Sequence, residues 1–128
     1  MGAILIVDDD ETNNFYVKHV LSKLSITENF YFALNGQEAL KVIDELANKG
    51  ISTDLILLDI NMPIMNGFEF LDAYEKLPET SRSKTVITMM SSSVHSADME
   101  RSKSYKSIDN CIEKPLTKEK METILSYL

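Results

Sequence analysis

The sequence predicts an α/β fold, a three-layer doubly wound sandwich in which helices cover both faces of one parallel β-sheet. Short apolar runs alternate with longer amphipathic stretches along the chain, a pattern typical of strands buried in a parallel sheet. The alternation occurs five times, and right-handed crossovers between successive strands place helices on both faces of the sheet. We therefore expect a (βα)5 domain around five parallel strands.

The predicted strands are brief and are bounded by polar or turn residues, as buried strands should be. In chain order they are Ala3–Val7, Phe30–Ala33, Leu55–Leu58, Val86–Met90 and Cys111–Ile112.

Four of the stretches between and after these strands carry apolar residues at helical spacing, which predicts one apolar stripe on each helix. The stripes are Val17, Val20, Leu21 and Leu24; Ala39, Leu40, Ile43, Leu46 and Ala47; Phe70, Leu71 and Tyr74; and Met121, Ile124, Leu125 and Leu128. The stretch His95–Ser107 differs, because it is rich in serine and charge and offers only Ala97, Met99 and Tyr105 for packing. We expect it to be the least firmly held helix.

Length and composition indicate the number of domains, the compartment and the kinds of partner to expect. The 128 residues suit a single domain, 1–128, with its own core. One cysteine, Cys111, and no Cys/His cluster with zinc spacing favour a reducing compartment, the cytoplasm. The apolar run Ala3–Val7 is too short for a signal peptide or a membrane span. The net charge of −7 argues against direct binding of nucleic acid, which needs a basic surface.

Polar residues follow four of the predicted strands. They are Asp8 to Asp10, Asp59 to Pro63, Ser91 to Ser93, and Lys114 with Pro115. The functional crevice of such a sheet lies beyond the carboxyl ends of its strands, so these groups should meet at one edge. Packing Asp8, Asp9 and Asp59 together opposes folding unless a cation compensates their charge. An oxygen-only donor set favours Mg²⁺, with Mn²⁺ or Ca²⁺ as substitutes.

A carboxylate, a divalent cation, a hydroxyl and an ammonium group in one crevice are the parts of a phosphoryl-transfer site. A carboxylate can act as nucleophile and form an acyl phosphate, while the cation and Lys114 neutralise the transferring oxygens and Ser91 donates a hydrogen bond. Each part alone has a structural explanation, such as a helix N-terminus for the acidic triplet or a surface cation for Lys114. Their joint position after successive strands favours the functional explanation.

Four segments carry a likeness to a known family. They are Ile4–Asp10, Ala33–Leu40, Leu55–Glu69 and Ile112–Leu116. With them the chain resembles, over essentially its whole length, the receiver domains of two-component response regulators, including the single-domain chemotaxis type. The resemblance implies a flavodoxin-like sheet with the strand order 2-1-3-4-5.

The resemblance also implies a role for each acidic residue. Asp59 would be the phospho-acceptor. Asp9 and Asp59 would bind Mg²⁺ directly, Asp8 would act through a metal-bound water, and the backbone carbonyl of Asn61 would complete the protein's ligands. Members of the family catalyse only their own phosphorylation and slow dephosphorylation. The resemblance therefore implies that this chain is not a conventional enzyme.

The remaining site residues follow from the same likeness. Lys114 would pair with the phosphoryl oxygens, and a cis peptide bond is common before the proline that follows it, here Pro115. Ser91 would be the switch hydroxyl, or Ser92 if the strand is one residue longer. At Cys111 the family usually carries Tyr or Phe, whose ring moves with the switch hydroxyl. Cysteine cannot reproduce that motion, so we interpret Cys111 as a small buried hydrophobic side chain, rather than a redox sensor, and as an atypical switch position.

The implied function is a phosphorylation-dependent switch. The phosphoryl donor would be a sensor histidine kinase or a histidine phosphotransfer protein. The fourth helix, fifth strand and fifth helix would form the face that changes conformation, meets an unidentified target and supports homodimers. Two alternatives remain: a receiver-like interaction module without phosphorylation, and an aspartyl-phosphate phosphatase. The second is disfavoured because phosphatases of the haloacid dehalogenase kind carry an acid two residues after the nucleophile, where this chain has Asn61.

Overall fold

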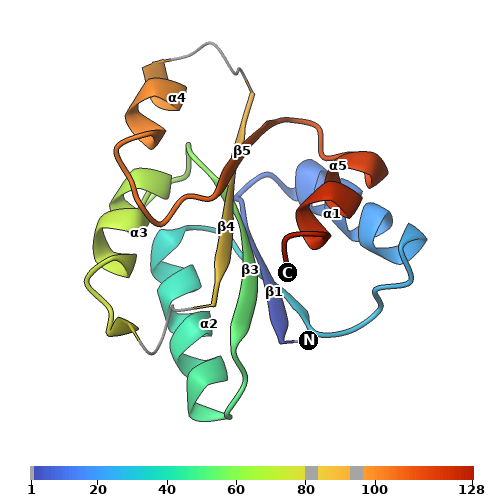
Figure 1. The fold of residues 1–128 in the computed structure, drawn as a ribbon, viewed down its shortest axis with the longest axis horizontal. Helices are drawn as coiled ribbons and strands as arrows, with labels where there is room; N and C mark the ends of the chain where they lie inside the picture. The colour runs from blue at the N-terminus through green and yellow to red at the C-terminus, as the bar shows by residue number, and fades with distance from the viewer. Residues whose placement is uncertain (1, 80–83, 93–96) are drawn as a thin grey trace.

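The structure is a computed structural model that describes residues 2–79, 84–92 and 97–128. These residues form a five-stranded parallel sheet in the order β2-β1-β3-β4-β5, which confirms the predicted sandwich (Figure 1). The strands are β1 (Ala3–Val7), β2 (Phe30–Ala33), β3 (Thr53–Asp59), β4 (Val86–Ser91) and β5 (Asn110–Glu113). The helices are α1 (Glu11–Lys23), α2 (Gly36–Asn48), α3 (Gly67–Tyr74), α4 (Ala97–Ser102) and α5 (Lys118–Leu125).

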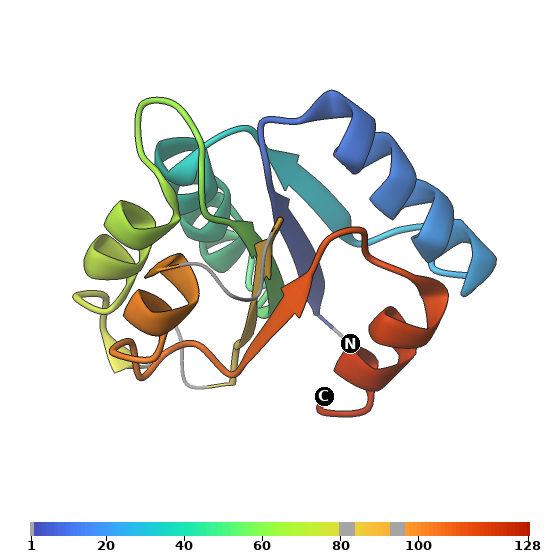
Figure 2. The ribbon, with the colours of Figure 1, turned by 90° about the horizontal axis from the view of Figure 1, so that it is seen from above.

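The helices cover the two faces of the sheet unequally. Helices α1 and α5 lie on one face, and α2, α3 and α4 lie on the other (Figure 2). Among the described residues no helix combines the length and the apolar character that crossing a membrane requires.

Each face of the sheet has its own hydrophobic core, because successive strand residues point to opposite sides. In β3, Ile56 and Leu58 join the core under α2 and α3, whereas Leu55 and Leu57 join the core under α1 and α5. All four are fully buried, and burying such a side chain contributes about 1.5–3 kcal/mol. The centre of the sheet is therefore buried on both faces.

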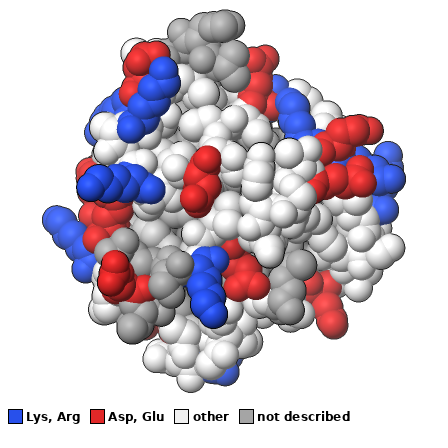
Figure 3. Space-filling model, viewed as in Figure 1, with Lys and Arg blue, Asp and Glu red and all other residues white. Residues whose placement is uncertain are grey.

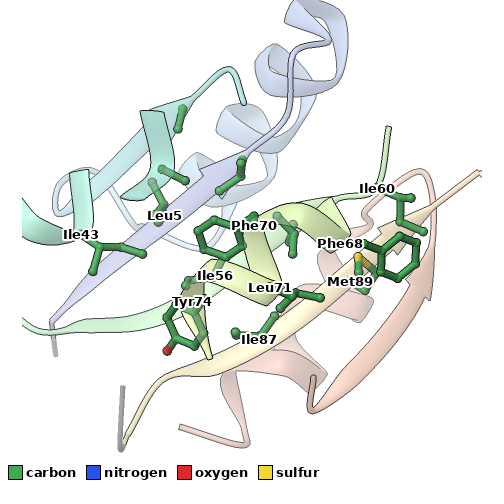
Figure 4. Close-up of a cluster of buried hydrophobic side chains, with 14 residues drawn as sticks. Leu5, Ile43, Ile56, Ile60, Phe68, Phe70, Leu71, Tyr74, Ile87 and Met89 are labelled. Atoms are coloured by element: carbon green, nitrogen blue, oxygen red, sulfur yellow. The ribbon is translucent and has the colours of Figure 1, made fainter. Parts of the chain in front are cut away.

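Helix α3 fills the larger core with aromatic side chains. Phe70, Leu71 and Tyr74 point from α3 onto the sheet beside Ile56 and Ile87 (Figure 4). The Phe70 and Tyr74 rings stack with their centroids 5.6 Å apart. The predicted stripe of this helix is thus confirmed.

Local hydrogen bonds explain where the helices begin. The Asp10 carboxylate accepts from the backbone N–H groups of Thr12 and Asn13, and the Asn35 side chain accepts from Glu38 N. At α3 a capping box joins Asn66 and Glu69. Such caps satisfy N–H groups that have no partner within the helix. Asp10 therefore has a structural role, whereas Asp8 and Asp9 remain available to the site.

The sequence-based boundaries differ from the structure in four elements. The helix expected over His95–Ser107 is described only as α4, Ala97–Ser102, and His95 and Ser93 lie outside the described residues. Strand β3 is longer than Leu55–Leu58, since it runs from Thr53 to Asp59. Strand β4 ends at Ser91 rather than Met90, and β5 runs from Asn110 to Glu113 rather than from Cys111 to Ile112. Polar residues at strand ends can still take part in the backbone ladder, which an apolar pattern does not reveal.

Three residues expected to pack are exposed. Ala97, Ala47 and Leu128 all face solvent, and Leu128 lies beyond the end of α5. Ala47 lies in the last turn of its helix, at the end of the expected apolar stripe. In α4 the buried residue is instead Ser102, which is 3% exposed.

Candidate functional site

A crevice of about 260 Å³ lies at the carboxyl ends of the strands. It is lined by Asp9, Asp10, Asp59, Ile60, Asn61, Ser91, Ser92, Asp98 and Lys114. Residues from five separate segments therefore meet where the sheet topology predicts a binding site.

Three carboxylates converge at this edge. Asp8, Asp9 and Asp59 each offer an oxygen within 4.8 Å of the others. Asp8 is fully buried and Asp59 is 8% exposed, whereas Asp9 is exposed. The predicted acidic cluster is thus present as a cluster, with one member open to solvent.

Lys114 lies between the two buried carboxylates. Its Nζ is 2.9 Å from Asp8 Oδ2 and 3.1 Å from Asp59 Oδ1. Its backbone N–H donates to the carbonyl of Ser91, and its peptide bond to Pro115 is cis, as expected. Burial alone lowers the pKa of Lys114, but the hydrogen bond to Asp8 and the charge of Asp59 outweigh burial and raise it. Lys114 is therefore a permanent cation in the site.

Asp59 has an unusual acidity. Burial, and then the negative charge of Asp8, raise its pKa from 3.8 to about 6, although Lys114 acts in the opposite direction. One ammonium group thus compensates three carboxylates only in part. An oxygen-only donor set with excess negative charge suits a hard divalent cation such as Mg²⁺, so the residues present fit the expected metal.

The serines after β4 are both at the crevice. Ser91 is the last residue of β4 and is 6% exposed, whereas Ser92 is exposed. Ser91 is paired in register with Glu113, directly before Lys114. Strand β4 is one residue longer than expected, which was the condition for Ser92 as the switch hydroxyl. Ser91 is nevertheless the buried serine at the crevice, beside the strand that precedes Lys114, so Ser91 stays the candidate.

Gly67 allows α3 to approach the end of β3 closely. A Cβ atom at this position would lie 2.5 Å from the carbonyl oxygen of Asp59, and the Gly67 N–H donates to the carbonyl of Ile60 at 2.8 Å. Any larger residue would displace the backbone that carries the candidate acceptor.

Sequence reasoning missed two side chains of the site. Asn13 donates from Nδ2 to Asp8 Oδ2 at 2.7 Å, and Asp98 lines the crevice from α4. Side chains in a helix point toward its N-terminus, so the position of Asn13 in the first turn after the acidic triplet was an available signal. Asp98 had no comparable signal, because the start of its helix is weakly patterned.

Cys111 packs against the larger core as expected, but it is less buried than predicted. Its thiol is half-buried and lies 3.4 Å from the Ser102 hydroxyl on α4. Tyr105, which follows α4, stacks on Phe68 of α3 with the centroids 5.6 Å apart. The guanidinium of Arg101 lies 4.3 Å from the centroid of the same Phe68 ring.

Fold and site together define the class of CheY-like domains with a flavodoxin-like fold. A family model described as the response regulator receiver domain matches residues 4–126. The chain belongs to this family of two-component signalling domains, whose members are generally switches and typically bind Mg²⁺ at an acidic pocket.

Known relatives agree with this assignment. The chain is 34% identical over 96% of its length to the autoinducer 1 sensor kinase/phosphatase LuxN of Vibrio campbellii, of which it spans 13%. It is 32% identical over 97% of its length to two-component response regulator 24 of Arabidopsis thaliana, of which it covers 81%.

Solved structures show the same fold. A two-component response regulator from Cytophaga hutchinsonii matches with a TM-score of 0.87 and 26% identity, over 97% of this chain and 93% of that one. The chemotaxis response regulator CheY4 of Vibrio cholerae matches with a TM-score of 0.77 and 26% identity, over 100% of this chain and 99% of that one.

Proposed function

We propose that this chain is a phosphorylation-dependent switch in which Asp59 accepts a phosphoryl group from a histidine kinase or a histidine phosphotransfer protein. The observation that carries the proposal is the position of Lys114, whose ammonium lies within 3.1 Å of the carboxylates of both Asp8 and Asp59. A basic carboxylate beside a fixed cation, in a crevice open to solvent, has the parts that an acyl phosphate requires.

The chemistry is a single displacement at phosphorus. An oxygen of the ionised Asp59 attacks, the bond between phosphorus and the donor's imidazole nitrogen breaks, and the electron pair remains on that nitrogen. Lys114 shifts from Asp59 Oδ1 toward a phosphoryl oxygen, and Ser91 donates a hydrogen bond to another.

Mg²⁺ is the cofactor that the donor set favours. Asp9 and Asp59 would bind it directly, Asp8 through a bound water, and Asn61 through its backbone carbonyl. When bound, the ion neutralises charge on the transferring oxygens. Mn²⁺ and Ca²⁺ share the preference for oxygen ligands and are the expected substitutes.

The proposed output face comprises α4, β5 and α5. Figure 3 shows a broad uncharged surface on this face, interrupted by an acidic side chain near its centre and bordered by further charged side chains. A groove here is lined by Asn110, Cys111, Ile112, Lys120, Thr123, Ile124 and Tyr127. Such a surface suits a protein target or a second copy of the chain better than nucleic acid.

The proposal also covers the domain organisation and the compartment of the chain. Residues 1–128 act as one receiver domain, and the cytoplasm is the compartment in which histidine kinases present their phosphoryl donors and Cys111 stays reduced.

Incubation with acetyl phosphate and Mg²⁺, followed by intact-mass measurement, tests the proposal. We expect a gain of one phosphoryl group that is absent in Asp59→Asn and absent when the metal is chelated. No gain in the native chain would instead indicate an inert interaction module. Continuous release of phosphate from unrelated esters would indicate a phosphatase.

A further inference from the structure

Within the described residues, three donors hold the buried carboxylate of Asp8. The backbone N–H of Asp10 donates to Oδ1 at 2.9 Å. The other oxygen, Oδ2, accepts from Asn13 Nδ2 at 2.7 Å and from Lys114 Nζ at 2.9 Å. One oxygen is therefore shared between a neutral amide on α1 and the cation after β5.

This sharing matters because Lys114 has two tasks. In the present structure its ammonium serves Asp8 and Asp59, yet the proposed function requires it to pair with a phosphoryl oxygen. An ionised carboxylate without solvent contact strongly resists losing a donor. If Lys114 were the sole side-chain donor to Asp8, its movement toward a phosphoryl oxygen would leave the Asp8 carboxylate without a side-chain donor. The carboxylate would therefore oppose that movement.

We infer that Asn13 is a positioning residue that orients Asp8 and frees Lys114 to follow the phosphoryl group. The inference rests on the proposed function and deepens it. Asn13 keeps Oδ2 of Asp8 hydrogen-bonded when Lys114 moves away. Because the amide is neutral, it does so without adding a positive charge that would compete with a divalent cation for the acidic cluster.

The start of α1 explains how Asn13 reaches Asp8. The Asp10 carboxylate caps the helix and accepts from the backbone N–H of Asn13 at 3.3 Å, which fixes the first turn. The side chain then points back toward the end of β1. The neighbouring Asn14 also donates its amide, but to the backbone carbonyl of Asp8 at 2.9 Å, so it supports the chain without touching the carboxylate.

These two asparagines provide a matched pair of variants. Asn13→Ala removes the donor to the carboxylate, Asn14→Ala removes an equivalent donor to the main chain, and Asn13→Gln keeps an amide at the position. Thermal unfolding of each variant shows that it is folded before it is compared. Two quantities are then measured: the dissociation constant for Mg²⁺ alone by calorimetry, and the phosphorylation rate at saturating acetyl phosphate by intact mass.

We expect Asn13→Ala to weaken Mg²⁺ binding and to slow phosphorylation at saturating donor, each by about tenfold, because Lys114 then stays on Asp8 and Asp59. The concentration of acetyl phosphate at half-saturation should change little. Asn14→Ala should alter neither quantity by more than about twofold, and Asn13→Gln should recover part of both losses.

Equal losses in Asn13→Ala and Asn14→Ala, or an unchanged Mg²⁺ dissociation constant in Asn13→Ala, would overturn the role of Asn13. If the native chain takes up no phosphoryl group, the proposed function fails, while the Mg²⁺ measurement still decides whether Asn13 prepares the acidic cluster.

Discussion

Asp59 is largely buried and has a negative neighbour, Asp8, and a positive one, Lys114. Burial and the negative charge of Asp8 raise the pKa of Asp59 to about 6, although Lys114 acts to lower it. A raised carboxylate pKa means that the folded chain binds this proton more tightly than the unfolded chain does. Protonated Asp59 therefore stabilises the folded chain. This contribution to the free energy of unfolding is fully present below pH 3.8 and is lost as the pH rises through about 6. At neutral pH the ionised Asp59 therefore destabilises the metal-free protein.

Replacing Asp59 by Asn should accordingly stabilise the metal-free protein at neutral pH. We expect Asp59→Asn to raise the free energy of unfolding by about 1–2 kcal/mol near pH 7.5, less than the full pKa shift implies because Lys114 loses a partner. The gain should shrink steadily as the pH falls from 6 to 3.8. Urea denaturation with a chelator present measures it, and a gain independent of pH would contradict the assigned cause.

Among the elements, α4 depends most on contacts from its neighbours. It has six residues, too few for a stable isolated helix. Its attachment to α3 comes from Arg101 over the Phe68 ring, and from Tyr105, which stacks on Phe68 and donates to Asp72 Oδ1 at 2.9 Å. The element expected to be loosely held therefore has a specific aromatic anchor.

Removal of this anchor should loosen α4 selectively. Tyr105→Ala loses an aromatic pair and a hydrogen bond, interactions that together are worth about 1–2 kcal/mol. We expect amide hydrogen exchange in α4 to quicken about tenfold, with little change in β1 and β3. Tyr16→Ala, which removes a partly exposed ring on α1, is the control. Similar exchange changes in both variants would mean that Tyr105 has no special role in holding α4.

At the scale of the whole molecule, the alternation of apolar runs and helical stripes was sufficient to predict the layers, and the family likeness implied the strand order. The same pattern placed Asp8, Asp59 and Lys114 at one edge, because parallel strands end together. These long-range predictions succeeded because sheet topology, rather than any local contact, brings the residues together.

The features that sequence reasoning missed depend on side-chain direction and on weakly patterned segments. Asn13 reaches Asp8 because the Asp10 cap fixes the first turn of α1, and with it the direction of the Asn13 side chain. Tyr105 packs on Phe68 from the loop after α4, although it was expected on the helix itself. Hydrophobic periodicity does not report such contacts, since neither depends on an apolar stripe.

In the proposed function Asp59 carries the phosphoryl group, although several other acidic residues lie at the same edge of the sheet. After incubation with acetyl phosphate and Mg²⁺, borohydride reduces an acyl phosphate of aspartate to homoserine, which peptide mass spectrometry locates. We expect homoserine at position 59 and at no other aspartate of the crevice. Homoserine at Asp9 or Asp98, with residue 59 unchanged, would contradict it.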